Sequence, residues 1–236
     1  MRILGIECTA APVSCAILED GKLKAEYFLN LKTTHSQTLL PMCESVLKLS
    51  GLDLSDIDVI AATVGPGSFT GVRIGISAVK GLGFADCKPC VPVSVLEAMA
   101  YGFLSETCVV CACMDARCNQ VYNALFRVES GQVTRLCDDR ALMIDELYED
   151  ILKYNGEKIV IVGDGAELFY KNVKDRDVSV QLAPENLRWQ RASGVCMAAK
   201  SRAEKGGTVS PDELLPFYLR LPQAERELKA KQNSQK

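Results

Sequence analysis

Residues 58–75 read "DVIAATVGPGSFTGVRIG", and the fold is predicted outward from this stretch. Residues 58–64 are apolar except for Asp58 and Thr63, which is typical of a buried central strand. Three glycines and a proline then interrupt the run, and small and apolar residues follow. The pattern predicts a strand, a tight loop and a helix over 71–85, which together form one βα unit of a layered α/β domain.

The glycine-rich loop raises the question of a phosphate site. Gly65 and Gly71 are separated by five residues, and Val72 follows where a Walker loop requires lysine. In a dinucleotide fingerprint the third glycine stands one residue earlier. The start of the helix can still attract an anion through its free N–H groups, but a tight turn with a hydroxyl cap explains the loop better. The loop residues are Gly65, Pro66, Gly67 and the two alternative caps Ser68 and Thr70.

The order of predicted elements occurs twice along the chain. Each half shows three strands, a helix, a strand, a glycine-bearing loop and a helix, with the turns Asp20-Gly21 and Ser130-Gly131 at matching places. A strand meander that leads into β-α-β units implies a mixed sheet with helices on its faces. Two such lobes with a cleft between them have the layout of the actin-like ATPase (ASKHA) fold. The expected boundaries are 1–104 for the first lobe, 105–215 for the second, and 216–236 for a C-terminal helix and tail.

The predicted elements of the first lobe follow from apolar runs and turn signals. Thr34 to Gln37 has the spacing of a capping box for a helix that extends to about Ser50, and Pro41 either delays or kinks that helix. The strands are expected at 2–8, 12–19, 22–30, 58–64 and 90–93, and a further helix begins at Ser94.

Composition excludes several classes of protein. The 236 residues carry 27 basic and 30 acidic side chains, so the chain lacks the basic excess of a protein that grips nucleic acid alone. No apolar run approaches the roughly 18 residues that span a bilayer. The apolar run at residues 3–6 is too short for a signal peptide. We therefore expect a cytoplasmic protein without membrane contact.

Cysteine and histidine usage argues against a metal site. An odd count of eleven cysteines without a regular framework predicts free thiols. Cys87 and Cys90 have redox or metal spacing, but no second pair and no histidine lies near them. The single histidine, His35, excludes a histidine-pair site within one chain, and no G-x-S-x-G elbow accompanies it. We interpret His35 as a capping or interface residue, and we expect no bound metal.

Several segments in order along nearly the whole chain resemble the TsaB (YeaZ) family. They are "GIECTAAPVSCAILEDGKL", "THSQTLLP", "GPGSFTGVRIG", "SVLEAMA", "DARCNQVYNALF", "VGDGA" and "PFYLRLPQAE". The resemblance implies an accessory subunit that binds and activates its relative TsaD, which makes N6-threonylcarbamoyladenosine at position 37 of tRNA. It also implies that the ATPase TsaE joins the assembly and that tRNA is reached only through the complex. The sequence leaves a homodimer of the free protein open.

The expected cleft contains acids but lacks the glycines of a phosphate site. Actin-like ATPases hold phosphates in two hairpins, which here correspond to 7–12 and 115–120. The first has Glu7 and Thr9, the second has Asp115, and neither has a glycine that would let backbone amides approach a phosphate. Most of the family would show aspartate where Glu7 stands. We interpret these three residues as vestigial and expect no cofactor and no catalytic residue.

The predicted helix over 71–85 has more apolar surface than one sheet needs. On a helical wheel its apolar and glycine positions span about 220°, whereas a helix on one sheet needs a stripe of roughly 100° or a little more. Either the C-terminal helix of the same chain covers the remainder, or a partner subunit does, together with the helix over 35–50; our hypothesis is the partner. The expected interface residues are His35, Leu39, Cys43, Gly71, Val72, Ile74, Gly75, Ala78 and Val79.

Two other functions are compatible with the same sequence features. A small actin-like enzyme that uses a nucleotide, such as a kinase, would bind ATP and magnesium in the cleft. The other is a self-associating regulatory protein of the same fold.

Overall fold

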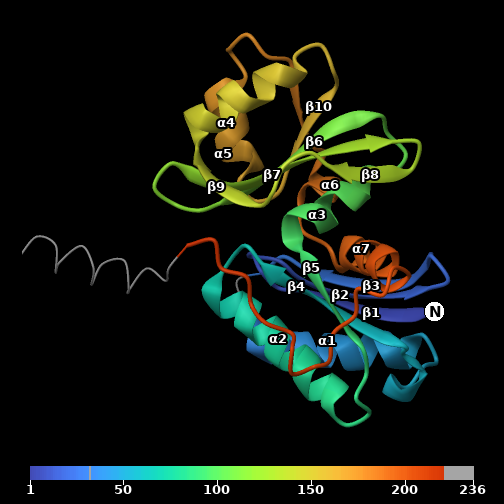
Figure 1. The fold of residues 1–236 in the computed structure, drawn as a ribbon. Coiled ribbons are helices and arrows are strands. Elements are labelled where there is room, and N and C mark those ends of the chain that lie inside the picture. The colour runs from blue at the N-terminus through green and yellow to red at the C-terminus, as the bar shows by residue number, and fades with distance from the viewer. Residues whose placement is uncertain (32, 221–236) are drawn as a thin grey trace, which may run out of the picture.

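The structure, a computed structural model, describes residues 1–31 and 33–220. Figure 1 shows two lobes, each built on one sheet with helices on its faces. The strand orders are β3-β2-β1-β4-β5 in the first lobe and β11-β10-β6-β7-β8 in the second, where β9 also pairs with β7. The predicted architecture of two mixed sheets flanked by helices is confirmed.

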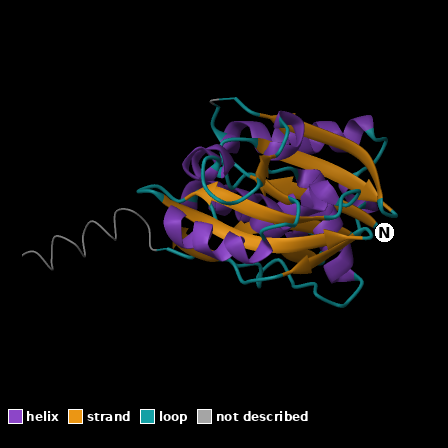
Figure 2. Cartoon of the chain, turned by 90° about the horizontal axis from the view of Figure 1, so that it is seen from above, coloured by secondary structure: helices purple, strands orange, loops and turns teal. Residues whose placement is uncertain are grey.

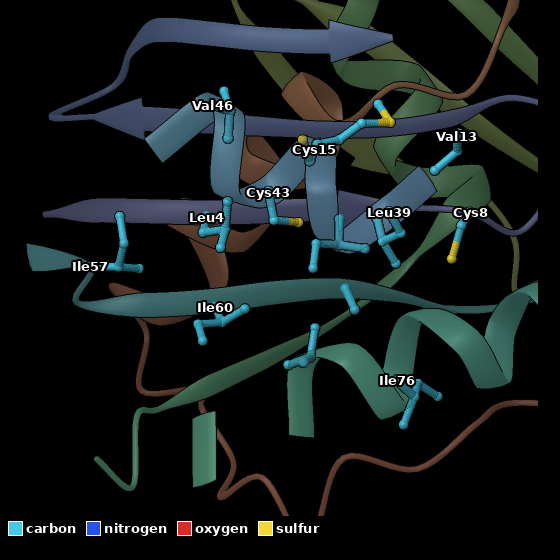
Figure 3. Close-up of a cluster of buried hydrophobic side chains, with 14 of the residues drawn as sticks. Leu4, Cys8, Val13, Cys15, Leu39, Cys43, Val46, Ile57, Ile60 and Ile76 are labelled. Atoms are coloured by element: carbon cyan, nitrogen blue, oxygen red, sulfur yellow. The ribbon is translucent and has the colours of Figure 1, made fainter. Parts of the chain in front are cut away.

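The first sheet separates two apolar layers. Its strands are β1 (Arg2–Glu7), β2 (Val13–Glu19), β3 (Lys22–Leu29), β4 (Val59–Gly65) and β5 (Cys90–Ser94). One face packs against α1 (His35–Leu49) and α2 (Phe69–Phe84), and Figure 3 shows part of this core. The other face packs against α7 (Ala192–Ala203), which lies on the side of the sheet that faces the second lobe (Figure 1). Alternation along β1 accounts for this division, because Leu4 and Ile6 point to one face and Ile3 to the other.

The second lobe repeats the plan with additions. Its strands are β6 (Cys108–Asp115), β7 (Gln120–Glu129), β8 (Gln132–Arg135), β9 (Arg140–Met143), β10 (Ile159–Val162) and β11 (Val180–Leu182). The helices α4 (Ile144–Ile151) and α5 (Ala166–Val173) cover one face. α3 (Val95–Ala100) covers the other face and also contacts α7, so it joins the lobes, and α6 (Glu185–Arg188) follows β11. The view from above shows the strands of both lobes with helices around them (Figure 2).

Several local expectations differ from the structure. α1 begins at His35, but Thr34 makes no side-chain cap bond, so the expected capping box is not formed. Pro41 lies inside α1, since the helix starts six residues before it. α2 begins two residues earlier than predicted, because Ser68 rather than Thr70 is its cap.

The C-terminal part of the chain returns to the first lobe. α7 packs on the first sheet, and Leu214 belongs to the core below α1 and α2. The second lobe therefore ends near residue 190 in packing terms rather than at 215. Residues 216–220 are not helical, and the C-terminal helix expected beyond them lies outside the described residues. Among the described helices, none is long and apolar enough to cross a membrane.

Candidate functional site

The glycine-rich loop serves to seat α2 against the first hairpin. Ser68 Oγ accepts a bond from Gly71 N at 3.2 Å, and Ser68 N donates to Thr9 O at 2.7 Å. A Cβ at Gly71 would collide with the Cys8 carbonyl oxygen, so only glycine allows the helix to come this close. The loop and the helix start thus pack directly against the Cys8 and Thr9 carbonyl groups of the first hairpin.

Glu7 lies at the end of β1 and is fully buried. Its Oε1 accepts bonds from Thr9 N and Thr9 Oγ1, both at 2.6 Å, while Oε2 has no hydrogen-bond partner among the described residues. Burial raises the pKa of this carboxyl, against the opposing effect of the Thr9 bonds. The Glu7 carboxyl is therefore enclosed in the protein and does not line the cleft between the lobes.

The interlobe cleft is a cavity of about 480 Å³. Asp115 lines it, and Asp115 Oδ1 accepts a bond from Arg117 N at 2.7 Å, which ties the carboxyl to its own turn. The other polar residues that line the cleft come from both lobes and from the C-terminal segment: Thr9, Ser68, Arg117, Tyr122, Asp164, Tyr218 and Arg220. The cleft therefore brings together Thr9 and Asp115, as expected, while Glu7 is walled off behind Thr9.

Asp164 is a cleft residue that the sequence analysis did not single out. It lies in the loop after β10, and its Oδ1 accepts a bond from Gln190 Nε2 at 2.7 Å. Burial raises the pKa of Asp164 to about 6, and the neighbouring Asp115 carboxylate acts in the same direction. The glycines of "VGDGA" marked this loop, but no periodic signal showed that its carboxyl would face the first lobe.

The raised pKa of Asp164 makes stability depend on pH. The folded protein binds the Asp164 proton more tightly than the unfolded chain does. The protonated carboxyl therefore adds to the free energy of unfolding, fully so below about pH 4, and this addition is lost as pH rises through about 6. Asp164→Asn keeps an acceptor for Gln190 and removes the charge. We expect the variant to exceed the wild type in unfolding free energy by about 3 kcal/mol at pH 7 and by little at pH 4. Urea unfolding at both values measures this, with the exposed Asp138→Asn as control; equal differences at the two pH values would contradict it.

The described residues contain no group of three or more metal-ligating side chains. Cys87 is exposed and Cys90 buried, so the pair does not face a common site. All eleven cysteines are free thiols, as predicted, and eight of them are buried. His35 Nε2 lies 2.8 Å from Ala10 O, which ties the start of α1 to the first hairpin.

A shallow apolar groove lies between α1 and α2. Ile74 and Ala78 are half-buried there, and Leu40 on α1 is 50% exposed. The lining residues are Ser36, Leu39, Leu40, Phe69, Thr70, Arg73, Ile74, Ser77 and Ala78. Ile74 and Ala78 are thus the expected interface residues that present surface in this groove.

Most of the expected interface residues are part of the protein's own core. Leu39, Cys43, Val72 and Val79 are at most 2% exposed, and Gly71 and Gly75 are buried against the first hairpin. A helical wheel shows which residues share a face but not which part of a wide apolar face meets the sheet. The surface open to a partner is therefore narrower than expected.

The same chain covers another side of α2, in extended rather than helical form. Residues 209–220, which we call the strap, run along the helix. Lys80 Nζ donates to Asp212 O at 3.1 Å, and the Tyr218 ring stacks on Phe69 with 4.7 Å between centroids. The strap leaves the groove between α1 and α2 uncovered among the described residues.

Comparison with known proteins gives the family. The fold defines a protein of two-lobed, actin-like architecture in which the glycine-rich loop packs against the first hairpin. The family model described as "TsaD: tRNA N6-adenosine threonylcarbamoyltransferase" matches residues 28–228. The chain belongs to the TsaB (YeaZ) family, within the wider group that this model describes.

Two relatives and one solved structure carry this assignment. The "tRNA threonylcarbamoyladenosine biosynthesis protein TsaB" of Escherichia coli is 31% identical over 98% of this chain and 100% of its own length. The protein of the same name from Bacillus subtilis is 28% identical over 95% of this chain and 96% of its own. The structure of YeaZ from Pseudomonas aeruginosa superposes with a TM-score of 0.80 at 27% identity, and covers 92% of this chain and 99% of that one.

Proposed function

We propose that this chain is an accessory subunit that binds and activates a TsaD-type transferase in forming N6-threonylcarbamoyladenosine at position 37 of tRNA. The observation that carries the proposal is the burial of Glu7, the acid of the first hairpin. Glu7 is 0% exposed and does not line the cleft. A protein that keeps the fold with this acid sealed in its interior is suited to binding its catalytic relative rather than to chemistry of its own. The name shared by the two relatives, tRNA threonylcarbamoyladenosine biosynthesis protein, supports the assignment to this pathway.

The groove between α1 and α2 is the proposed docking surface. Ile74 and Ala78 offer apolar surface, and the small side chains of Ser36 and Ser77 beside them allow a partner helix to approach closely. Exposed apolar surface next to a polar rim is characteristic of a protein-binding site. We further propose that TsaE joins the assembled complex, that tRNA is contacted only through the complex, and that the protein acts in the cytoplasm.

Two alternatives make different predictions. A nucleotide-dependent enzyme would bind ATP and magnesium in the 480 Å³ cleft, which calorimetry on the isolated chain would detect as micromolar affinity. A self-associating regulator would place a second copy on the same groove. A homodimer of the free protein is compatible with the accessory role if the transferase displaces the second copy.

The test of the proposal uses the complete modification system with the cleft acids changed. Glu7→Gln and Asp115→Asn should each leave the rate of tRNA modification within about twofold of wild type, because neither residue contacts a reacting atom, whereas loss of a transition-state contact typically costs about 100-fold or more. Modification is followed by mass spectrometry of tRNA nucleosides. A loss of that size in a variant that folds and assembles normally would show that the cleft is an active site.

A further inference from the structure

The strap connects the two lobes along one side of the cleft. It begins with paired bonds between Val209 and Cys90, each 2.8 Å from N to O, and Leu214 anchors it in the core of the first lobe. Figure 1 draws it in red as it leaves the region of α7 and passes along α2. Residues 217–220 then line the interlobe cavity. The strap therefore forms one wall of the cleft.

An aromatic stack fixes the strap to the first lobe. Phe217 N donates to Val64 O at 2.7 Å, and Tyr218 stacks on Phe69. The Arg73 guanidinium lies 3.8 Å from the centroid of the Phe69 ring, and Arg73 Nε donates to the Tyr218 hydroxyl at 3.0 Å. Phe69 and Arg73 also line the groove between α1 and α2. One pair of side chains thus faces the groove and holds the strap.

The far end of the strap reaches the second lobe. Arg220 Nη1 donates to Ala116 O at 2.6 Å. Ala116 opens the β6–β7 turn, in which three consecutive non-glycine residues, Arg117, Cys118 and Asn119, have φ of 65°, 54° and 58°. L-residues disfavour this left-handed conformation, so the turn depends on the contacts that hold it. The charge-assisted bond from Arg220 is one of these contacts.

We propose that the strap is a latch that holds the two lobes together, and that a partner seated on the groove tightens it. The stack of Phe69, Arg73 and Tyr218 links the groove to the strap. A partner that buries this stack strengthens the cation–π contact of Arg73 with Phe69, and the strap is then bound more firmly to α2. Coupling between sites is reciprocal, so a weakened strap should also weaken docking. The latch consists of contacts within the free chain, whereas its tightening by a partner rests on the proposed function.

Hydrogen exchange of the free protein tests the latch. The amides of Ala116 and Gln120 report on the turn, since they donate to Gln120 O and Arg117 O at 3.0 and 3.2 Å. Arg220→Ala and Tyr218→Ala should each speed their exchange about tenfold or more, as for the loss of one charge-assisted bond. Arg220→Lys should restore part of the protection. Unchanged exchange in Arg220→Ala would overturn the latch.

Arg127→Ala is the matched control for these variants. Arg127 also makes charge-assisted bonds in the second lobe, to both carboxylate oxygens of Glu157 at 2.7 and 2.8 Å, and it lies near the far end of β7 from the turn. This variant should leave exchange of the Ala116 and Gln120 amides as in wild type. Faster exchange in the control would mean that any lost surface contact loosens the turn, and the latch would be rejected.

The same measurement with a TsaD-type subunit added tests the tightening. Exchange at Ala116 and Gln120 should slow about threefold or more in wild type and less in Tyr218→Ala, which should also bind the subunit more weakly. A subunit that binds without slowing exchange would overturn the tightening and leave docking intact. A subunit that does not bind would overturn the proposed function and the tightening together, while the latch would still be decided by the free protein.

Discussion

Ile74→Glu should leave the protein folded and reduce its affinity for a TsaD-type subunit by about 100-fold or more. Ile74 is half-buried in the groove, so its replacement meets water in the free protein. In the complex the new carboxylate would be desolvated without a partner, which costs far more than the lost apolar contact. Co-elution on size exclusion and titration calorimetry measure the effect.

A control variant separates the groove from a general effect of added charge. Asn172→Glu places the same carboxylate on an exposed position of α5 in the second lobe. It should bind as wild type does. If Ile74→Glu keeps a native circular dichroism spectrum and still binds like wild type, the groove is not the docking surface.

Val72→Glu should unfold the protein, although it lies two residues from Ile74 on the same helix. Val72 is 0% exposed and packs in the core between α2 and the first sheet. An unpaired carboxylate there costs an amount comparable with the whole stability of a domain, about 5 to 15 kcal/mol. Thermal melting followed by circular dichroism, with Ile74→Glu as the matched variant, measures the loss. A cooperative melt of Val72→Glu near the wild-type midpoint would contradict the packing of α2.

Burial also predicts the effect of a glutamate at two further positions on α2. Val79 is fully buried and should behave like Val72, while Ala78 is half-buried in the groove and should behave like Ile74. The division follows from the geometry of the helix on its sheet.

Most of the architecture could be predicted from the sequence, because hairpin turns and apolar strands are marked by residues that lie close together in the chain. The Asp20-Gly21 and Ser130-Gly131 hairpins and the strand before the glycine-rich loop all occur as predicted. β9 and β11 have only four and three residues, too short for a clear alternation. α7 was missed because it is covered on more than one side, by the first sheet and by α3, so its apolar residues do not form a single stripe.

The site was less predictable because it depends on contacts between distant segments. The glycine spacing predicted a turn with a hydroxyl cap, and Ser68 is that cap, but only the structure shows that the loop contacts the Thr9 hairpin. The wide apolar arc of α2 was real, yet most of it faces the protein's own core. The strap has no periodic pattern that would place it along α2. Its position depends on single contacts such as the stack of Tyr218 on Phe69.

The rate of threonylcarbamoyl transfer to tRNA decides whether the chain acts by docking through the groove. It is measured with the TsaD-type subunit and the rest of the system, first without this chain, then with the wild type, and then with Ile74→Glu. We expect the wild type to stimulate transfer and Ile74→Glu to give no more than the rate without the chain. Stimulation by Ile74→Glu equal to that of wild type would contradict it, because the chain would then act without docking through the groove between α1 and α2.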